Sequence, residues 1–251
     1  MKSRIMKALS VFFVFLMISM AFIPAVSAQV ELKQNQLEPV PSQKEIEKFI
    51  RENTTTLKKT ATEEITEIRT EKSIIYTVTW VDETDSSKIN IAFIPQDELI
   101  DSGYLNARDI KDNDRVSSAA SKAKVSFSRQ SYAQNYGNVT NGGIHVHFSE
   151  EDALLIRALS ALAPAIGGAI GTLLGGVLGA PGGPLAVVPA AALKALGTLV
   201  GVCFTAGVII AYSYGKNSDG SIDLKMSYAS IYLKYIGLPG ILQVGSYSIP
   251  I

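Results

Sequence analysis

The chain has 251 residues, of which 47% are hydrophobic, and its 23 Lys and Arg residues balance its 23 Asp and Glu residues. Its single cysteine, Cys203, excludes an intrachain disulfide and lies in an apolar run, where a thiol behaves as a small hydrophobic side chain. The neutral total hides an asymmetry, because residues 29–153 carry 15 basic and 21 acidic side chains, whereas residues 154–251 carry five basic and two acidic ones. Such a difference between halves points to interaction with a membrane or a partner.

The N-terminus has the three parts of a secretory signal peptide. Basic residues begin the chain, and an apolar stretch runs from Ala8 to Ile23. Small residues at Val26 and Ala28 then mark a cleavage site before Gln29. We therefore predict a signal peptide at residues 1–28 and an exported protein, secreted or membrane-associated at the cell surface. An uncleaved anchor is the alternative, although the apolar stretch is short for a membrane span.

Residues 29–130 are predicted to form a polar, acidic N-terminal region with one β-hairpin. A strand is expected over Ile65–Val81, where apolar and polar side chains come to alternate, followed by a turn at residues 82–87 and a return at residues 88–94. This hairpin has few apolar partners, so we expect it to be half-buried. Residues 101–131 are interpreted as a solvated loop or a weak helix. The whole acidic region is a candidate pro-region that masks the hydrophobic part of the chain until it is cleaved.

The remainder, residues 131–251, is predicted to be the hydrophobic region, and it begins with a short strand at residues 144–148. His145 and His147 point to the same side of this strand, and two imidazoles so placed can share a metal ion. No cysteine, third histidine or suitably placed carboxylate completes a ligand set in the sequence, and an exposed strand face is the simpler interpretation. We therefore predict no metal and no cofactor, and leave metal binding by these two histidines open.

Two uncharged runs dominate the region that follows. Ser149 and Asp152 form a capping box, which predicts a helix with an acidic first turn. Residues 158–193 then contain no Asp, Glu, Lys, Arg or His, and residues 195–215 are uncharged as well. With a segment rich in Gly and Pro between them, these runs predict a hydrophobic helical hairpin over residues 149–215.

Small residues recur at every fourth position of this predicted hairpin. In a membrane, such a ridge lets two helices approach closely. The predicted helix-packing residues are Gly167, Gly171, Gly175, Gly179, Gly197, Gly201 and Thr205. Two charged residues of the hairpin, Arg157 and Lys194, are predicted to face lipid and to favour anionic headgroups.

A second β-hairpin is predicted at the C-terminal end, over residues 221–250. Apolar side chains alternate with polar ones from Ile222 to Tyr228, the strand is expected to continue to Tyr235, and residues 241–249 form its return. The predicted fold class is therefore α+β, with a hydrophobic glycine-rich helical hairpin flanked by small antiparallel β-hairpins.

These segments resemble parts of known membrane-active proteins. The four glycines from Gly167 to Gly179 resemble the glycine zipper of membrane channels and pore-forming toxins, and the paired apolar runs are similar to the hydrophobic hairpin of colicin-type pore formers. Tyr136-Gly137-Asn138, followed by a short strand and a stretch rich in Gly and Ala, resembles pediocin-type bacteriocins. The sequence departs from that family at Val139, where a glycine is expected, and it lacks the family's cysteines. The resemblances together cover at most residues 136–215.

No Ser/His/Asp grouping and no paired-carboxylate site is visible in the sequence, so we do not predict an enzyme. The leading hypothesis is a secreted membrane-active protein of bacteriocin or pore-forming type, which inserts the hairpin into a lipid bilayer. A homo-oligomer is left open, and no nucleic acid is expected as a partner. The alternative is a non-toxic membrane-anchored cell-surface protein whose soluble regions bind an unknown partner.

Overall fold

The computed structural model describes Lys48, residues 51–71, 73–137 and 141–158, Gly207, and residues 216–235 and 237–250. All of them belong to one unit of the chain, Val40–Ile251. The predicted signal peptide lies outside the described residues. So does nearly all of residues 158–215, which are uncharged apart from Lys194 and which we call the uncharged segment. Ala158 and Gly207 are its two described positions.

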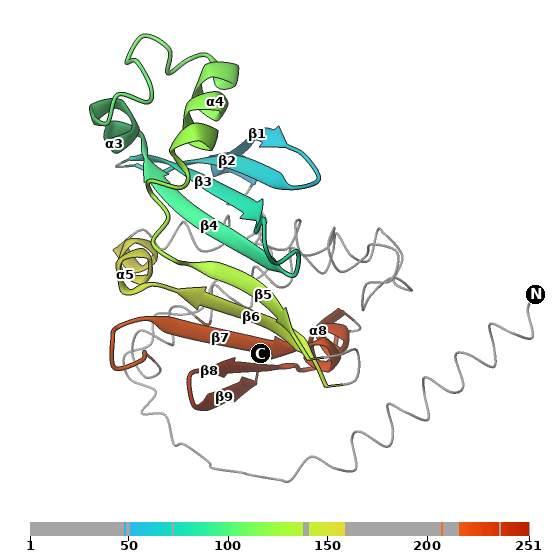
Figure 1. Ribbon diagram of the computed structural model, residues 1–251. Helices are drawn as coiled ribbons and strands as arrows, with labels where there is room; N and C mark the ends of the chain where they lie inside the picture. Colours follow the sequence, from blue (N-terminus) through green and yellow to red (C-terminus); the bar gives the residue numbers. More distant parts are fainter. Residues whose placement is uncertain are drawn as a thin grey trace, which may run out of the picture. The chain divides into compact units, whose positions relative to one another are not determined.

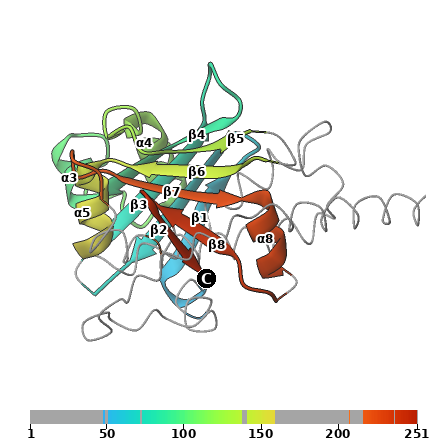
Figure 2. The same cartoon turned by 90° about the horizontal axis from the view of Figure 1, so that it is seen from below.

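The described residues form one antiparallel sheet of nine strands, in which each strand pairs with the next one along the chain (Figures 1 and 2). The strands are β1 (Thr54–Lys59), β2 (Glu63–Arg69), β3 (Ile74–Val81), β4 (Lys88–Pro95), β5 (Tyr132–Tyr136), β6 (Gly143–Phe148), β7 (Ile222–Ser227), β8 (Ile241–Val244) and β9 (Tyr247–Pro250). The helices are α3 (Gln96–Asp101), α4 (Asn113–Ala123), α5 (Glu150–Ala158) and α8 (Tyr228–Tyr235).

Alternation along the strands gives the sheet two faces of different character. Residues directly paired in an antiparallel ladder point to the same side, so rows of side chains can be followed across the strands. One row is apolar throughout and consists of Val81, Ile89, Ala133, Val146, Leu224 and Val244. The neighbouring row consists of Glu63, Trp80, Asn90, Tyr132, His147 and Asp223. We call the side of the first row the back face and the side of the second row the front face.

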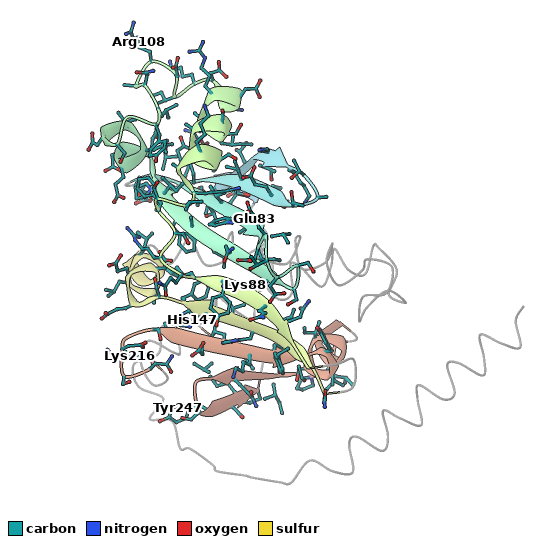
Figure 3. The ribbon with its side chains drawn as sticks, in the orientation of Figure 1. Glu83, Lys88, Arg108, His147, Lys216 and Tyr247 are labelled. Atoms are coloured by element: carbon teal, nitrogen blue, oxygen red, sulfur yellow. The ribbon has the colours of Figure 1, made fainter. Side chains whose placement is uncertain are left out.

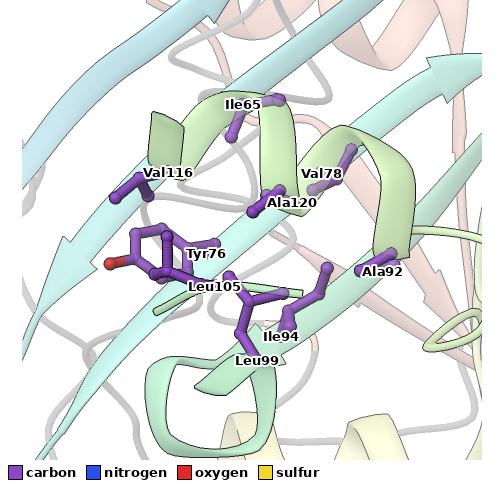
Figure 4. Packing of buried hydrophobic residues seen from close by; sticks show 11 residues of the cluster. Ile65, Tyr76, Val78, Ala92, Ile94, Leu99, Leu105, Val116 and Ala120 are labelled. Carbon is purple, nitrogen blue, oxygen red and sulfur yellow. The ribbon is translucent and has the colours of Figure 1, made fainter. Parts of the chain in front are cut away.

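Over β2–β4 the front face is covered by α3 and α4, which enclose a hydrophobic cluster (Figure 4). The buried members of this cluster are Ile65, Tyr76, Val78, Ala92, Ile94, Leu99, Leu105, Val116, Ala119, Ala120 and Ala123. The helix α4 begins at Asp112, whose side chain accepts hydrogen bonds from the amides of Asp114 and Arg115. Its small buried residues recur at helical spacing and allow it to lie close to the strands. The solvated loop or weak helix expected at residues 101–131 thus contains a capped helix with a buried face.

A carboxylate fastens α4 to the sheet. Glu63 on β2 accepts hydrogen bonds from Ser121 Oγ at 2.8 Å and Lys124 Nζ at 2.6 Å, and it also forms an ion pair with Lys58. The Lys124 ammonium group lies 5.3 Å from the ring centre of Trp80, within reach of a cation–π attraction. Burial alone would raise the pKa of Glu63, but the hydrogen bonds from Lys124, Lys58 and Ser121 lower it to about 2.

The predicted helix start between β6 and α5 is present, with one of the two hydrogen bonds of the predicted capping box. Ser149 Oγ accepts a hydrogen bond from the amide of Asp152 at 3.2 Å. The amide of Ser149 donates instead to Ser131 Oγ at 3.0 Å, and the Ser131 hydroxyl donates to Asp152 Oδ2 at 2.5 Å. Because this carboxylate is buried, its pKa is raised, although Ser131, Arg129 and Ser149 oppose the shift. The start of α5 is therefore tied to the segment that leads into β5.

The strands expected from alternation are present, but several boundaries differ. The long strand expected over residues 65–81 consists of β2 and β3 with a turn between them, and the pair β3–β4 is buried instead of half-buried. The strand expected at residues 228–235 is the helix α8. It begins there because Ser227 Oγ accepts a hydrogen bond from the amide of Ser230 at 3.1 Å, which caps a helix and ends β7.

The predicted fold class is wrong. The two expected β-hairpins are joined in a single sheet through the β4–β5, β5–β6 and β6–β7 pairs, and this sheet, not a helical hairpin, dominates the described residues. Among the residues that the structure describes, none of the helices combines the length and the apolar character needed to cross a bilayer. The predictions of a transmembrane helix and of a glycine zipper are corrected accordingly.

Candidate functional site

Most residues predicted from the sequence to act in the membrane lie outside the described part of the chain. These are Gly167, Gly171, Gly175, Gly179, Lys194, Gly197, Gly201 and Thr205. Arg157 lies in the last turn of α5. His145 and His147 lie on β6, as expected, and belong to the polar half of the front face, over β5–β7.

Both histidines converge on one carboxylate from the neighbouring strand. Asp223 on β7 is paired directly with His147 in the ladder, and its Oδ1 atom lies 3.0 Å from His147 Nδ1 and 2.6 Å from His145 Nε2. An ionised carboxylate can only accept hydrogen bonds, so each of these ring nitrogens donates. The side chains of His145, His147 and Asp223 are 19%, 23% and 28% exposed, so solvent and small ligands reach all three.

The second oxygen of Asp223 is held by the turn that precedes β7. Asn217 Nδ2 donates to Asp223 Oδ2 at 2.8 Å and also lies 2.8 Å from Ser221 Oγ. Gly220 permits this tight turn, since its φ of 82° is a conformation that residues with a Cβ rarely adopt. Burial opposes ionisation of Asp223, but the hydrogen bonds from Asn217, His145 and His147 prevail and lower its pKa.

Tyr132 on β5 packs against both histidines. Its ring is stacked on His147, with a centroid distance of 5.2 Å and an interplanar angle of 25°, and meets His145 edge-on at 5.7 Å. The Lys88 ammonium group lies 4.8 Å from the Tyr132 ring centre (Figure 3 labels His147 and Lys88). Burial and the nearby Asp223 charge both raise the pKa of Tyr132. The imidazoles are therefore limited in their rotation by a tyrosine that stays protonated.

The ring nitrogens of His145 and His147 and the carboxylate of Asp223 lie close together but are not placed around a common metal position. No group of three or more His, Cys, Asp and Glu side chains in the described part of the chain stands arranged to hold a metal ion as it is. In the cluster of His145, His147 and Asp223, which we call the histidine–aspartate cluster, the three side chains are closed onto one another by hydrogen bonds. Chemically, the cluster offers two imidazoles and one ionised carboxylate at a site open to water.

Sequence reasoning found the two histidines but missed the aspartate. Asp223 lies 76 and 78 residues further along the chain, so only the pairing of β6 with β7 brings it to them. A signal was present, because both strands alternate clearly and each must present its polar residues on one side. What the sequence lacked was the information that these two strands are neighbours.

A second feature lies on the back face, at Gly207. Gly207 is buried, and a Cβ atom placed on it would lie 2.8 Å from Leu242 Cδ2 and 3.0 Å from Leu224 Cδ2. Leu224 and Leu242 are themselves fully buried on β7 and β8. At this position, the uncharged segment packs directly on the apolar side of the sheet.

Compared with protein-family models, with curated proteins and with solved structures, the chain matches none. The resemblances to bacteriocins and pore formers therefore stay predictions. Function has to be argued from the residues themselves, since a fold alone does not specify it.

Proposed function

We propose that the protein is an exported, membrane-active protein of bacteriocin or pore-forming type, in which the uncharged segment at residues 158–215 is the part that binds lipid. The observation that carries the proposal is the absence of any charged side chain or histidine over residues 158–193. A hydrocarbon environment admits such a sequence readily, because transferring apolar side chains out of water is favourable by roughly 25 cal/mol per Å² of buried surface.

The contact at Gly207 supports a form in which the segment is kept out of water before it meets lipid. A Cβ atom on residue 207 would contact the terminal methyl groups of Leu224 and Leu242, so these two side chains would have to shift to admit it. An exported protein with a long uncharged segment must otherwise expose a large apolar surface, which leads to aggregation. The back face of the sheet thus supplies an apolar surface with which a bilayer would compete.

Charge supports a preference for anionic membranes. Residues 154–251 carry five basic and two acidic side chains, and Arg157, Lys194 and Lys216 lie next to or between the uncharged runs. Each Lys or Arg near an anionic surface contributes about 1 kcal/mol to binding. This attraction is screened over about 8–10 Å at physiological ionic strength, so binding should weaken as salt is added.

The proposal is tested by co-flotation of the exported chain with vesicles, using one substitution at two positions. Val177→Asp places a charge within the uncharged run, and Val125→Asp places the same charge on a side chain that is 71% exposed in the folded framework. A charge in hydrocarbon costs about 2.5–3.5 kcal/mol, so Val177→Asp should weaken binding to anionic vesicles by roughly 100-fold. Val125→Asp should bind as the unchanged protein does.

Circular dichroism and thermal unfolding of both variants show whether the framework is kept. Equal binding by Val177→Asp and the unchanged protein, with both folded, would contradict the assignment of the uncharged segment as the lipid-binding part. If Val177→Asp unfolds, the unchanged protein decides. Its failure to float with any vesicle would show that the membrane-active function is wrong.

The alternative, a surface protein that binds a partner through its folded part, is favoured by the polar half of the front face. His145, His147, Tyr132 and Lys225 are all at least partly exposed there, and they form a surface with aromatic rings and both signs of charge. Such a protein would stay with the producing cell's membrane through a high-salt wash. For a membrane-active toxin, the first contact with an anionic membrane would instead weaken as salt is added, because this contact depends on screened charges.

A further inference from the structure

We propose that His145, His147 and Asp223 bind a divalent transition-metal ion, for which Zn²⁺ is the natural probe. Two observations carry this. The nitrogen atoms of both imidazoles converge on one oxygen, Asp223 Oδ1, at 2.6 and 3.0 Å. The three side chains are also accessible, with 19–28% of each exposed to solvent. The inference concerns the sheet and does not depend on lipid binding by the uncharged segment.

The donor set selects the class of metal. Two imidazole nitrogens and one carboxylate oxygen are ligands that Zn²⁺, Ni²⁺ and Cu²⁺ accept, whereas Ca²⁺ and Mg²⁺ require oxygen ligands. Three protein ligands with one side open to water is the pattern of an accessible zinc centre, in which water completes the coordination.

Opening the cluster for an ion requires the carboxylate to move away from both imidazole rings. Metal bonds of about 2.0–2.1 Å in tetrahedral geometry place neighbouring ligand atoms about 3.3 Å apart, somewhat further than the present 2.6 and 3.0 Å. Each of these two N···O separations therefore has to grow by less than about 1 Å. Each neutral imidazole has to carry its proton on the ring nitrogen that faces away from Asp223, which frees the lone pair of the facing nitrogen without changing its charge.

The surroundings already orient the ligands in the way that metal sites require. Asn217 Nδ2 donates to Asp223 Oδ2 at 2.8 Å, so this oxygen stays fixed while Oδ1 is free to change partners. Tyr132 packs against both rings and restricts their rotation. Such supporting contacts raise metal affinity, and losing one typically costs 10–100-fold.

The composition of the chain allows metal binding to be followed at the histidines without interference from other imidazoles. The chain contains two histidines, and both belong to the cluster. Titrating the tag-free exported chain with ZnCl₂ should therefore move both imidazole resonances in a ¹⁵N-detected NMR spectrum together. Both should saturate at one equivalent, and calorimetry should report the same stoichiometry.

Variants separate ligation from stability. His147→Phe keeps an aromatic ring stacked on Tyr132 but removes a ligand, and Asp223→Asn keeps the size of the side chain but removes its charge. Each should weaken Zn²⁺ binding by at least about tenfold. Asp101→Asn, which removes an exposed carboxylate from α3 outside the cluster, is the matched control and should bind as the unchanged protein does.

Thermal unfolding without metal identifies any variant that fails to fold. In that case the proposal is decided by whether both imidazole NMR resonances of the unchanged protein move together as Zn²⁺ is added. Three results would overturn the assignment. They are saturation only at millimolar Zn²⁺, movement of one imidazole without the other, and equal affinity in His147→Phe and the unchanged protein.

Discussion

The two halves of the front face place a carboxylate at each end of the same row of side chains and use it differently. Glu63, on β2, is surrounded by Lys58, Lys124 and Ser121 beneath α4, and its side chain is 8% exposed. Asp223, on β7, is bonded by two imidazoles and an amide, and its side chain is 28% exposed. An ammonium group only donates hydrogen bonds and locks the first carboxylate, whereas a neutral imidazole also has a ring nitrogen with a free lone pair. The covered half is therefore built for stability, and the open half is available for binding.

The largest effect should come from removing an apolar side chain beneath α3 and α4. Ile94 is fully buried in the cluster of the covered half, so Ile94→Ala should lower the free energy of unfolding by about 2–5 kcal/mol. Lys225 is exposed in the open half, and Lys225→Ala should change this free energy by no more than about 0.5 kcal/mol. Urea unfolding measures both, and similar losses for the two variants would remove the distinction between the halves.

A smaller effect is expected from removing the charge that fastens α4. Glu63→Gln leaves Lys58 and Lys124 without their carboxylate and should cost about 1–3 kcal/mol in unfolding free energy. Glu83→Gln, on an exposed side chain of the β3–β4 turn, is the matched control and should have almost no effect. If the two changes cost the same, Glu63 does not hold the helix in place.

The smallest effect is the pH dependence of this fastening. The pKa of Glu63 is lowered from 4.5 to about 2, so its contribution to stability is complete above about pH 4.5 and is lost as the pH falls through 2. Between these limits, the unchanged protein should lose more stability than Glu63→Gln, because the variant has no proton to take up. Parallel curves of unfolding free energy against pH for the two proteins would show that Glu63 keeps an ordinary pKa.

Several strands, the β3–β4 hairpin and the start of α5 could be predicted from the sequence, but the pairing between distant strands could not. Alternation predicted β3, β4, β6 and β7, because a strand with one buried face must alternate. The capping residues Ser149 and Asp152 predicted where α5 begins. The β6–β7 pair joins segments that are about 75 residues apart, and no local pattern specifies which strands become neighbours.

The same limit explains the errors at α8 and at the candidate site. Residues 228–235 alternate well enough to suggest a strand, but the Ser227 hydroxyl caps a helix at that point. The two histidines were recognised as potential ligands, while their carboxylate partner belongs to another strand. The helical hairpin was predicted from the uncharged runs, the capping box and the spacing of small residues. These features specify an apolar environment without specifying which surface provides it.

The measurement that tests the proposed function most directly is release of a trapped dye from vesicles by the unmodified exported chain. We expect release from vesicles rich in anionic lipid, less release from zwitterionic vesicles, and a decrease in both as salt is raised from low to physiological ionic strength. A folded protein that releases no dye from vesicles of any composition, and that remains in the producing cell's membrane through a high-salt wash, would contradict the membrane-active function and favour the surface protein.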